Sequence, residues 1–62
     1  MTTLELKRIG TDDWNRPVYK DNNGKLWKDV NLGFFPISLH SAYRNEFDGE
    51  PDLPLILPYV II

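Results

Sequence analysis

Hydrophobic and polar residues alternate near the beginning of the chain. Within residues 3–9, Leu4 and Leu6 lie on the opposite side of an extended backbone from Glu5 and Lys7. A period of two residues is typical of a half-buried β-strand. We therefore predict a strand over residues 3–9, followed by a turn over residues 10–13, where glycine and aspartate favour turn conformations.

The strongest local pattern predicts a β-hairpin in the first half of the chain. Two strand-like segments, residues 18–20 and 26–30, flank the sequence Asp21-Asn22-Asn23-Gly24. Asparagine and glycine tolerate positive φ angles, so this sequence can form a tight hairpin turn. Pro17 has no N–H group to donate, which places it at the start of a strand or on an edge.

Side-chain pairing selects the length of the hairpin loop. A three-residue loop with Gly24 in the left-handed position puts Tyr19 opposite Trp27 and Asp21 opposite Lys25, and both cross-strand pairs are favourable. A four-residue loop would instead put Lys20 opposite Lys25, which is repulsive. We predict the three-residue loop.

The second half of the chain predicts a short helix and a final apolar segment. Ser38 can cap a helix over Leu39–Arg44, with Leu39 and Tyr43 on one face. Residues 53–62 carry no charge and are strand-like, although Pro58 interrupts them. This tail is either a core strand or an apolar surface that a partner covers, and the sequence leaves both readings open.

Together these elements predict one small α+β domain over residues 1–62. It is mainly antiparallel β, with three to four strands around the central hairpin and one short helix. The predicted core comprises Leu4, Leu6, Val18, Leu26, Val30, Leu32, Phe35, Leu39, Tyr43, Leu55, Leu57 and Val60.

Composition narrows the class of protein. The chain has 62 residues, a net charge of −2 and no cysteine, so we expect no disulfide framework and no thiolate metal site. The first residues lack the apolar segment of a secretory signal. The apolar run at residues 53–62 is about half as long as a membrane span. We therefore expect a cytoplasmic protein with no membrane contact.

Four acidic residues lie close together between positions 46 and 52. Alternate carboxylates around Gly49 resemble the beginning of a calcium loop, but no acidic residue follows Asp52 to complete the ligand set. We expect no metal and no cofactor, and interpret the segment as a solvated loop that can dock a basic partner. With the apolar tail, it gives the predicted partner-binding residues Glu46, Phe47, Asp48, Glu50, Asp52, Tyr59 and Ile61.

Aromatic and lysine residues of the hairpin suggest a second kind of surface. Small domains bind single-stranded nucleic acid by stacking bases on aromatic rings while cations follow the phosphates. The residues concerned here are Tyr19, Lys20, Lys25, Trp27 and Lys28. Aspartates on the same face dilute the positive charge, so we prefer to interpret the aromatics as packing.

Two sequence blocks resemble a known group of proteins. Residues 16–32 (RPVYKDNNGKLWKDVNL) and residues 39–52 (LHSAYRNEFDGEPD) are similar to short uncharacterised proteins of bacteria and their mobile elements. The resemblance covers about half of the chain. It implies a small bacterial or phage-related protein and no particular activity.

Catalytic groups are sparse in this sequence. His40 is the single histidine, and its neighbour Ser41 does not face it on a helix. We therefore expect no enzyme, but a protein-interaction module or small subunit that binds a protein partner or itself. A small single-stranded nucleic-acid-binding protein is the alternative.

Overall fold

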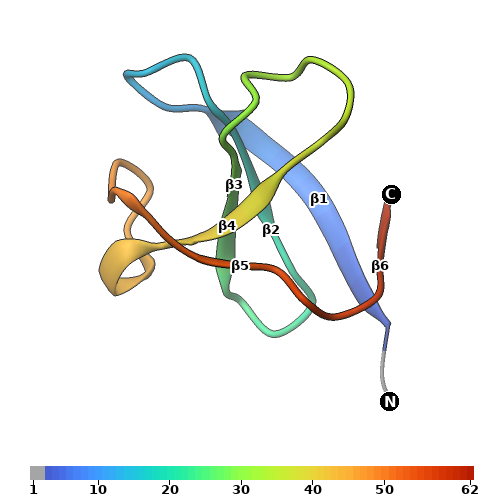
Figure 1. The fold of residues 1–62 in the computed structure, drawn as a ribbon. Helices are drawn as coiled ribbons and strands as arrows, with labels where there is room; N and C mark the ends of the chain where they lie inside the picture. The colour runs from blue at the N-terminus through green and yellow to red at the C-terminus, as the bar shows by residue number, and fades with distance from the viewer. Residues whose placement is uncertain (1–2) are drawn as a thin grey trace.

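The protein is built from β-strands. The computed structural model describes residues 3–62, which form six strands and one short 3₁₀ turn (Figure 1). The strands are β1 (Leu4–Thr11), β2 (Pro17–Lys20), β3 (Leu26–Asp29), β4 (Leu39–Ala42), β5 (Pro51–Pro54) and β6 (Tyr59–Ile61), and the turn η1 is Tyr43–Asn45. Within this part of the chain no helix is long and apolar enough to cross a membrane.

All six strands belong to one sheet, in the order β5-β4-β3-β2-β1-β6. The first five strands pair antiparallel with their neighbours in the chain, whereas β6 returns to pair parallel with β1. Because successive strands run in opposite directions, the β1–β2 and β3–β4 loops lie at the same end of the sheet. The β2–β3 turn and η1 lie at the other end (Figure 1).

The predicted hairpin is confirmed. β2 begins at Pro17, Tyr19 pairs with Trp27, and the N–H of Asp21 donates to the C=O of Lys25 at 2.9 Å. Gly24 has a φ of 84°, as the left-handed position of the loop requires.

The predicted helix over Leu39–Arg44 is wrong, and so is the α+β class. Leu39–Ala42 is strand β4, which pairs with β3 on one side and β5 on the other. Leu39 and Ala42 are both buried but belong to separate clusters of the core. A two-turn helix has little stability of its own, so the hydrogen bonds and burial offered by β3 outweigh the local preference. The fold is an all-β sheet of six strands.

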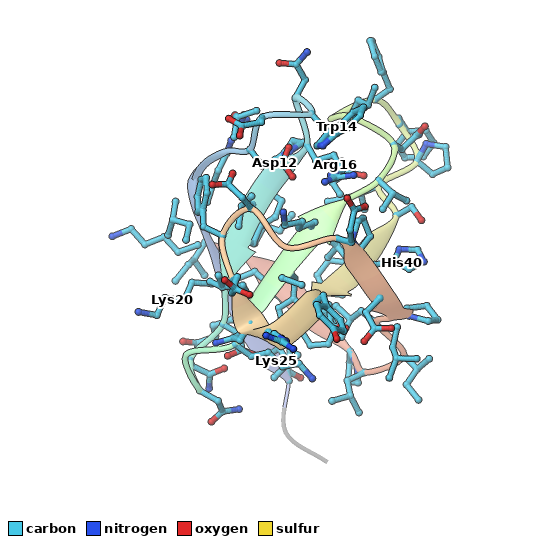
Figure 2. The ribbon with its side chains drawn as sticks, turned by 90° about the vertical axis from the view of Figure 1, so that its left-hand side faces the viewer. Asp12, Trp14, Arg16, Lys20, Lys25 and His40 are labelled. Carbon is cyan, nitrogen blue, oxygen red and sulfur yellow. The ribbon has the colours of Figure 1, made fainter. Side chains whose placement is uncertain are left out.

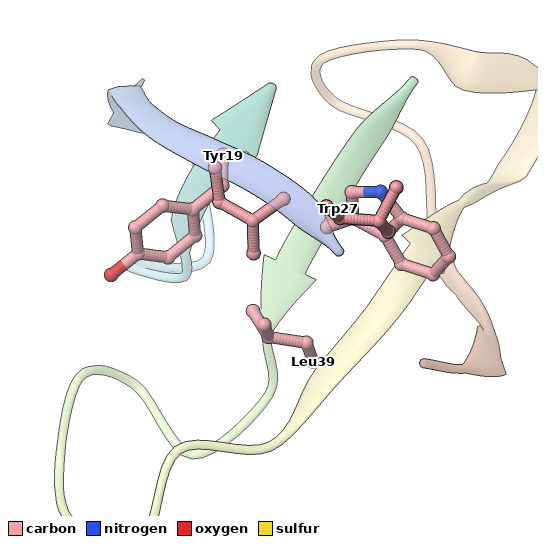
Figure 3. Packing of buried hydrophobic residues seen from close by; sticks show 5 residues of the cluster. Tyr19, Trp27 and Leu39 are labelled. Atoms are coloured by element: carbon pink, nitrogen blue, oxygen red, sulfur yellow. The ribbon is translucent and has the colours of Figure 1, made fainter. Parts of the chain in front are cut away.

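Both faces of the central strands are buried. One face carries the larger cluster, which includes Tyr19, Trp27 and Leu39 (Figure 3), and the other carries a smaller cluster. The larger cluster consists of Leu4, Leu6, Tyr19, Trp27 and Leu39, with Ile37, Leu55 and Tyr59 packed against it, and the smaller of Val18, Leu26 and Ala42, with Phe47 packed against it. The predicted core positions Leu4, Leu6, Val18, Leu26 and Leu39 are confirmed.

Six other predicted core residues are exposed. They are Val30, Leu32, Phe35, Tyr43, Leu57 and Val60. The first three lie in the β3–β4 loop or its beginning, and the remainder lie near sheet ends or on the last strand. Their hydrophobicity predicted burial, but they lie outside the two clusters that cover the faces of the central strands.

The apolar tail is partly core and partly exposed. Leu55 and Tyr59 pack against the larger cluster, and β6 pairs with β1. Ile56 and the last three residues are exposed. The tail is therefore part of the fold and also leaves an apolar surface.

The segment after β4 forms a closed loop that requires a glycine. The N–H of Tyr43 donates to the C=O of Glu50 at 2.8 Å, and the N–H of Gly49 donates to the C=O of Glu46 at 3.0 Å. A Cβ atom on Gly49 would clash with the backbone carbonyl oxygen of Tyr43. No side chain fits at this position without a backbone shift.

We predict that Gly49→Ala lowers the free energy of unfolding by about 3 kcal/mol, because the backbone of the loop must move. Gly24→Ala is the matched control, since the space around Gly24 is open and only the positive φ is unfavourable. It should cost about 1 kcal/mol. Urea unfolding followed by tryptophan fluorescence measures both values, and equal losses would contradict the steric argument.

Candidate functional site

A buried aspartate organises the loop between β1 and β2. One carboxylate oxygen of Asp12 accepts the backbone N–H groups of Trp14 and Arg16, both at 2.9 Å. The other oxygen accepts Nε of Arg16 and Nζ of Lys28, both at 2.8 Å. The carboxylate thus fixes the loop backbone and connects it to β3.

The ion pair between Asp12 and Lys28 is shielded from water. The side chain of Lys28 is fully buried, and that of Asp12 is 1% exposed. Burial alone would raise the pKa of Asp12, but the hydrogen bonds from Lys28, Arg16 and Trp14 outweigh it and hold this pKa well below its usual range. Asp12 therefore remains charged at neutral pH.

A second buried aspartate organises the loop between β3 and β4. The carboxylate of Asp29 accepts the backbone N–H groups of Asn31 at 2.9 Å, Gly33 at 3.1 Å and Ser38 at 3.1 Å. The side-chain amide of Asn31 then donates to the C=O groups of Phe34 and Pro36, at 3.0 and 2.8 Å. The carboxylate of Asp29 and the side-chain amide of Asn31 together hold the backbone of this loop, although most of its side chains face the solvent.

These two loops expose three large aromatic side chains. Phe35 is 97% exposed, Phe34 71% and Trp14 67%. Leu32, next to them, is also exposed and has a left-handed φ of 58°. We call the surface formed by Trp14, Leu32, Phe34 and Phe35 the aromatic end.

The two loops lie side by side. A Cβ atom on Gly33 would be 3.6 Å from Cγ of Pro17, the residue that follows the first loop. The guanidinium of Arg16 lies 6.0 Å from the centroid of the Trp14 ring. Figure 2 shows Trp14 and Arg16 beside Asp12 at one end of the molecule, with Lys25 toward the other end.

The residues proposed for nucleic-acid stacking are not available for it. Tyr19 and Trp27 are buried in the larger cluster, and Lys28 is buried against Asp12. Lys20 and Lys25 are exposed, on strand and turn positions with no exposed ring beside them to form a stacking platform. The strand alternation that suggested a shared aromatic face was correct, but that face is the inside of the protein.

A third aspartate holds the buried indole at the far end of the sheet. Asp21 accepts Nε1 of Trp27 at 3.0 Å and the backbone N–H groups of Asn23 and Lys25 at 2.8 and 2.9 Å. Burial alone would raise the pKa of Asp21, but the hydrogen bonds from Trp27, Lys25 and Asn23 and the charge of Lys25 together lower it. Asp21 has a structural role here.

The acidic segment follows η1, where the side chain of Asn45 bonds to the hairpin turn at this far end. Its four carboxylates are exposed. Phe47 points inward instead, since a Cβ atom on Gly10 would lie 3.0 Å from its ring. Across residues 3–62, the structure gathers no three histidine, aspartate or glutamate side chains into a possible metal site.

Two hollows lie away from the aromatic end. One, of about 190 Å³, is bounded by Lys7, Lys20 and Ile62, and the other, of about 350 Å³, by Lys25, Asn45 and other residues of the hairpin and β4–β5 region. The first is smaller than the pockets that usually hold a small ligand, and the second is at the low end of their range. Neither contains a set of convergent catalytic groups.

The chain matches no family model, no curated protein and no solved structure. The candidate site therefore depends on geometry alone. Sequence reasoning missed the aromatic end because it assigned Phe35 to the core and gave Trp14 no role. The usable signal was the placement of aspartates two residues before Trp14 and Asn31, a spacing at which a carboxylate can bond the backbone and leave neighbouring side chains outside.

We predict that Asp12→Asn lowers the free energy of unfolding at pH 7 by about 3–5 kcal/mol, because it leaves Lys28 and Arg16 buried without a counter-charge. In the unsubstituted protein the low pKa of Asp12 gives the sign of the pH dependence. Its contribution is complete above the ordinary aspartate pKa of about 3.9 and is lost as the pH falls further.

Chemical unfolding between about pH 2 and pH 7 measures both effects. Asp13→Asn is the control, since Asp13 is exposed and next to Asp12 in the chain. Its effect should stay within about 0.5 kcal/mol. An equally mild effect of Asp12→Asn would show that the buried ion pair is not a major source of stability.

Proposed function

We propose that this chain is a non-enzymatic protein-interaction module, or small subunit, that binds its partner through the aromatic end. The observation that carries the proposal is the exposure of Phe34, Phe35 and Trp14 on loops whose backbones are fixed by Asp12 and Asp29. Rigid loops with exposed aromatic residues are the arrangement that many binding proteins use.

The energetics favour such a surface. Aromatic side chains supply most of the binding free energy in many interfaces, because each buries a large area when it enters a pocket. Their loop is already ordered by hydrogen bonds, so little backbone entropy is lost when a partner binds. The partner is expected to offer an apolar groove that accepts the two phenylalanine rings.

Charge argues against nucleic acid as this partner. Residues 30–38 contain no charged side chain, and the other loop contributes Asp12 and Asp13 along with Arg16. A nucleic-acid surface needs cations beside the rings to bind phosphates. The exposed Lys20 and Lys25 lie away from the aromatic end.

The buried polar groups support a binding role over catalysis. The oxygens of Asp12, Asp21 and Asp29 are occupied by structural donors. Nδ1 of His40 is buried without a partner among the described residues, and His40 lies opposite Lys28 on the neighbouring strand. The three aspartates hold the loops in place, and within residues 3–62 His40 has no carboxylate or hydroxyl partner that would activate it.

Paired substitutions of the aromatic end test the proposal. We predict that Phe34→Ser with Phe35→Ser weakens partner binding at least tenfold, which corresponds to about 1.4 kcal/mol, while the free energy of unfolding changes by less than about 0.5 kcal/mol. Partners are first captured from source-cell extract with the unsubstituted and double-variant proteins, and a candidate is then titrated by calorimetry in purified form.

Ile56→Ser is the matched control, because Ile56 is 87% exposed and lies in the β5–β6 connection. It should bind like the unsubstituted protein. Titration with a single-stranded oligonucleotide at low salt is the second arm and should give no binding. Salt-sensitive oligonucleotide binding would refute the proposal. So would a partner affinity that is unchanged in the Phe34/Phe35 double variant.

A further inference from the structure

The outer edge of β6 is an open strand without charges. β6 is the last strand on one side of the sheet and pairs only with β1 in the described part of the chain. Its side chains, with that of Ile62, are aliphatic or aromatic, and Val60, Ile61 and Ile62 are 48–70% exposed. Sheet proteins usually protect such edges with lysine, proline or a bulge.

The hydrogen bonds to β1 identify the backbone groups at this edge. Pro58 accepts from the N–H of Leu4 at 2.9 Å, and Ile62 donates to the C=O of Leu6 at 2.8 Å. In a parallel pair alternate residues bond to the same neighbour. The N–H and C=O groups of Tyr59 and Ile61 therefore point away from β1, toward the open edge.

The opposite edge of the sheet is blocked. β5 is the other outer strand, and Pro51 and Pro54 are two of its four residues. Neither proline has an N–H group to donate, and Asp52 between them adds a charge. A β6 edge cannot easily add to a β5 edge, so extension into a fibre is disfavoured and an edge of the same kind is the better partner.

We infer that two copies of this chain pair through β6, antiparallel, about a twofold axis at Val60. In this register Tyr59 of each copy faces Ile61 of the other, and each of these pairs exchanges two backbone hydrogen bonds. Both strands are uncharged, so no like charges meet across the axis. The two sheets become one continuous sheet with β5 at both outer edges.

The second copy is favoured over a foreign strand by the self-complementary edge. A twofold interface requires that each contact be repeated with the roles exchanged, and the pairing of Tyr59 with Ile61 satisfies this requirement. β6 has only three residues, so its pairing buries less surface than a standard protein–protein interface. We therefore expect a dissociation constant on the order of 10 μM.

This inference rests on the proposed role in protein interaction. It adds a second copy of the chain as a partner, bound at the β6 edge instead of the aromatic end. Ile61→Pro is the sharpest test, because the N–H of Ile61 points outward and is not needed for pairing with β1. It should weaken dimerisation at least tenfold in sedimentation equilibrium over about 1 μM to 1 mM protein. Ile61→Lys should do the same by placing like charges near the axis, without changing the backbone.

Ile56→Lys is the matched control, since it adds the same charge at an exposed apolar position outside β6. It should dimerise like the unsubstituted protein. Near-ultraviolet circular dichroism of the buried Trp27 reports folding of each variant, and if Ile61→Pro unfolds, Ile61→Lys decides the result.

An unsubstituted protein that remains monomeric up to about 1 mM would overturn the inference, as would dimers that survive both Ile61 substitutions. The inference would also be wrong if a strand from a different protein paired with β6 while this chain remained monomeric. The double Phe34/Phe35 variant keeps this failure separate from that of the proposed function. It should dimerise normally, and loss of dimers in that variant alone would move self-association to the aromatic end.

Discussion

The ion pair between Asp12 and Lys28 is the contact on which the rest of the structure depends. A small sheet has little core, and here a fully buried lysine occupies part of one face of the central strand β3. Its charge is acceptable only because Asp12 meets it at 2.8 Å. The same carboxylate fixes the loop that presents Trp14, so one group links the stability of the sheet to the shape of the candidate binding surface.

Asp29 and Asp21 also fix loop backbones with a buried carboxylate, each at the end of a strand. Each is buried and bonds to backbone N–H groups of the loop that follows it. Short loops held in this way need few apolar contacts to remain ordered, which leaves their own apolar side chains free to face outward. This explains how a chain of 62 residues can keep Phe34 and Phe35 outside its core.

The two proposed surfaces have different physical origins. The aromatic end is a set of side chains on loops, and its recognition would depend on shape and on burial of the rings. The β6 edge is a row of backbone groups, and its recognition would depend on hydrogen bonds available to another strand. They use different parts of the sheet, so one copy could bind a partner at the aromatic end while it pairs with another copy through β6.

The sequence alone determined β1 and the β2–β3 hairpin, because both depend on residues that are close together in the chain. The period of Leu4 and Leu6, and the Asn-Asn-Gly turn, predicted β1 and the β2–β3 hairpin with its register, because adjacent residues alone decide these features. Tertiary structure decided the remainder. Leu39–Ala42 became a strand because β3 offered it an unpaired edge, and Lys28 became buried because Asp12, 16 residues away, supplied its counter-charge. Phe35 faced outward because the six strands provide no second layer above its loop, and the only local indication of this was the position of Asp29 two residues before Asn31.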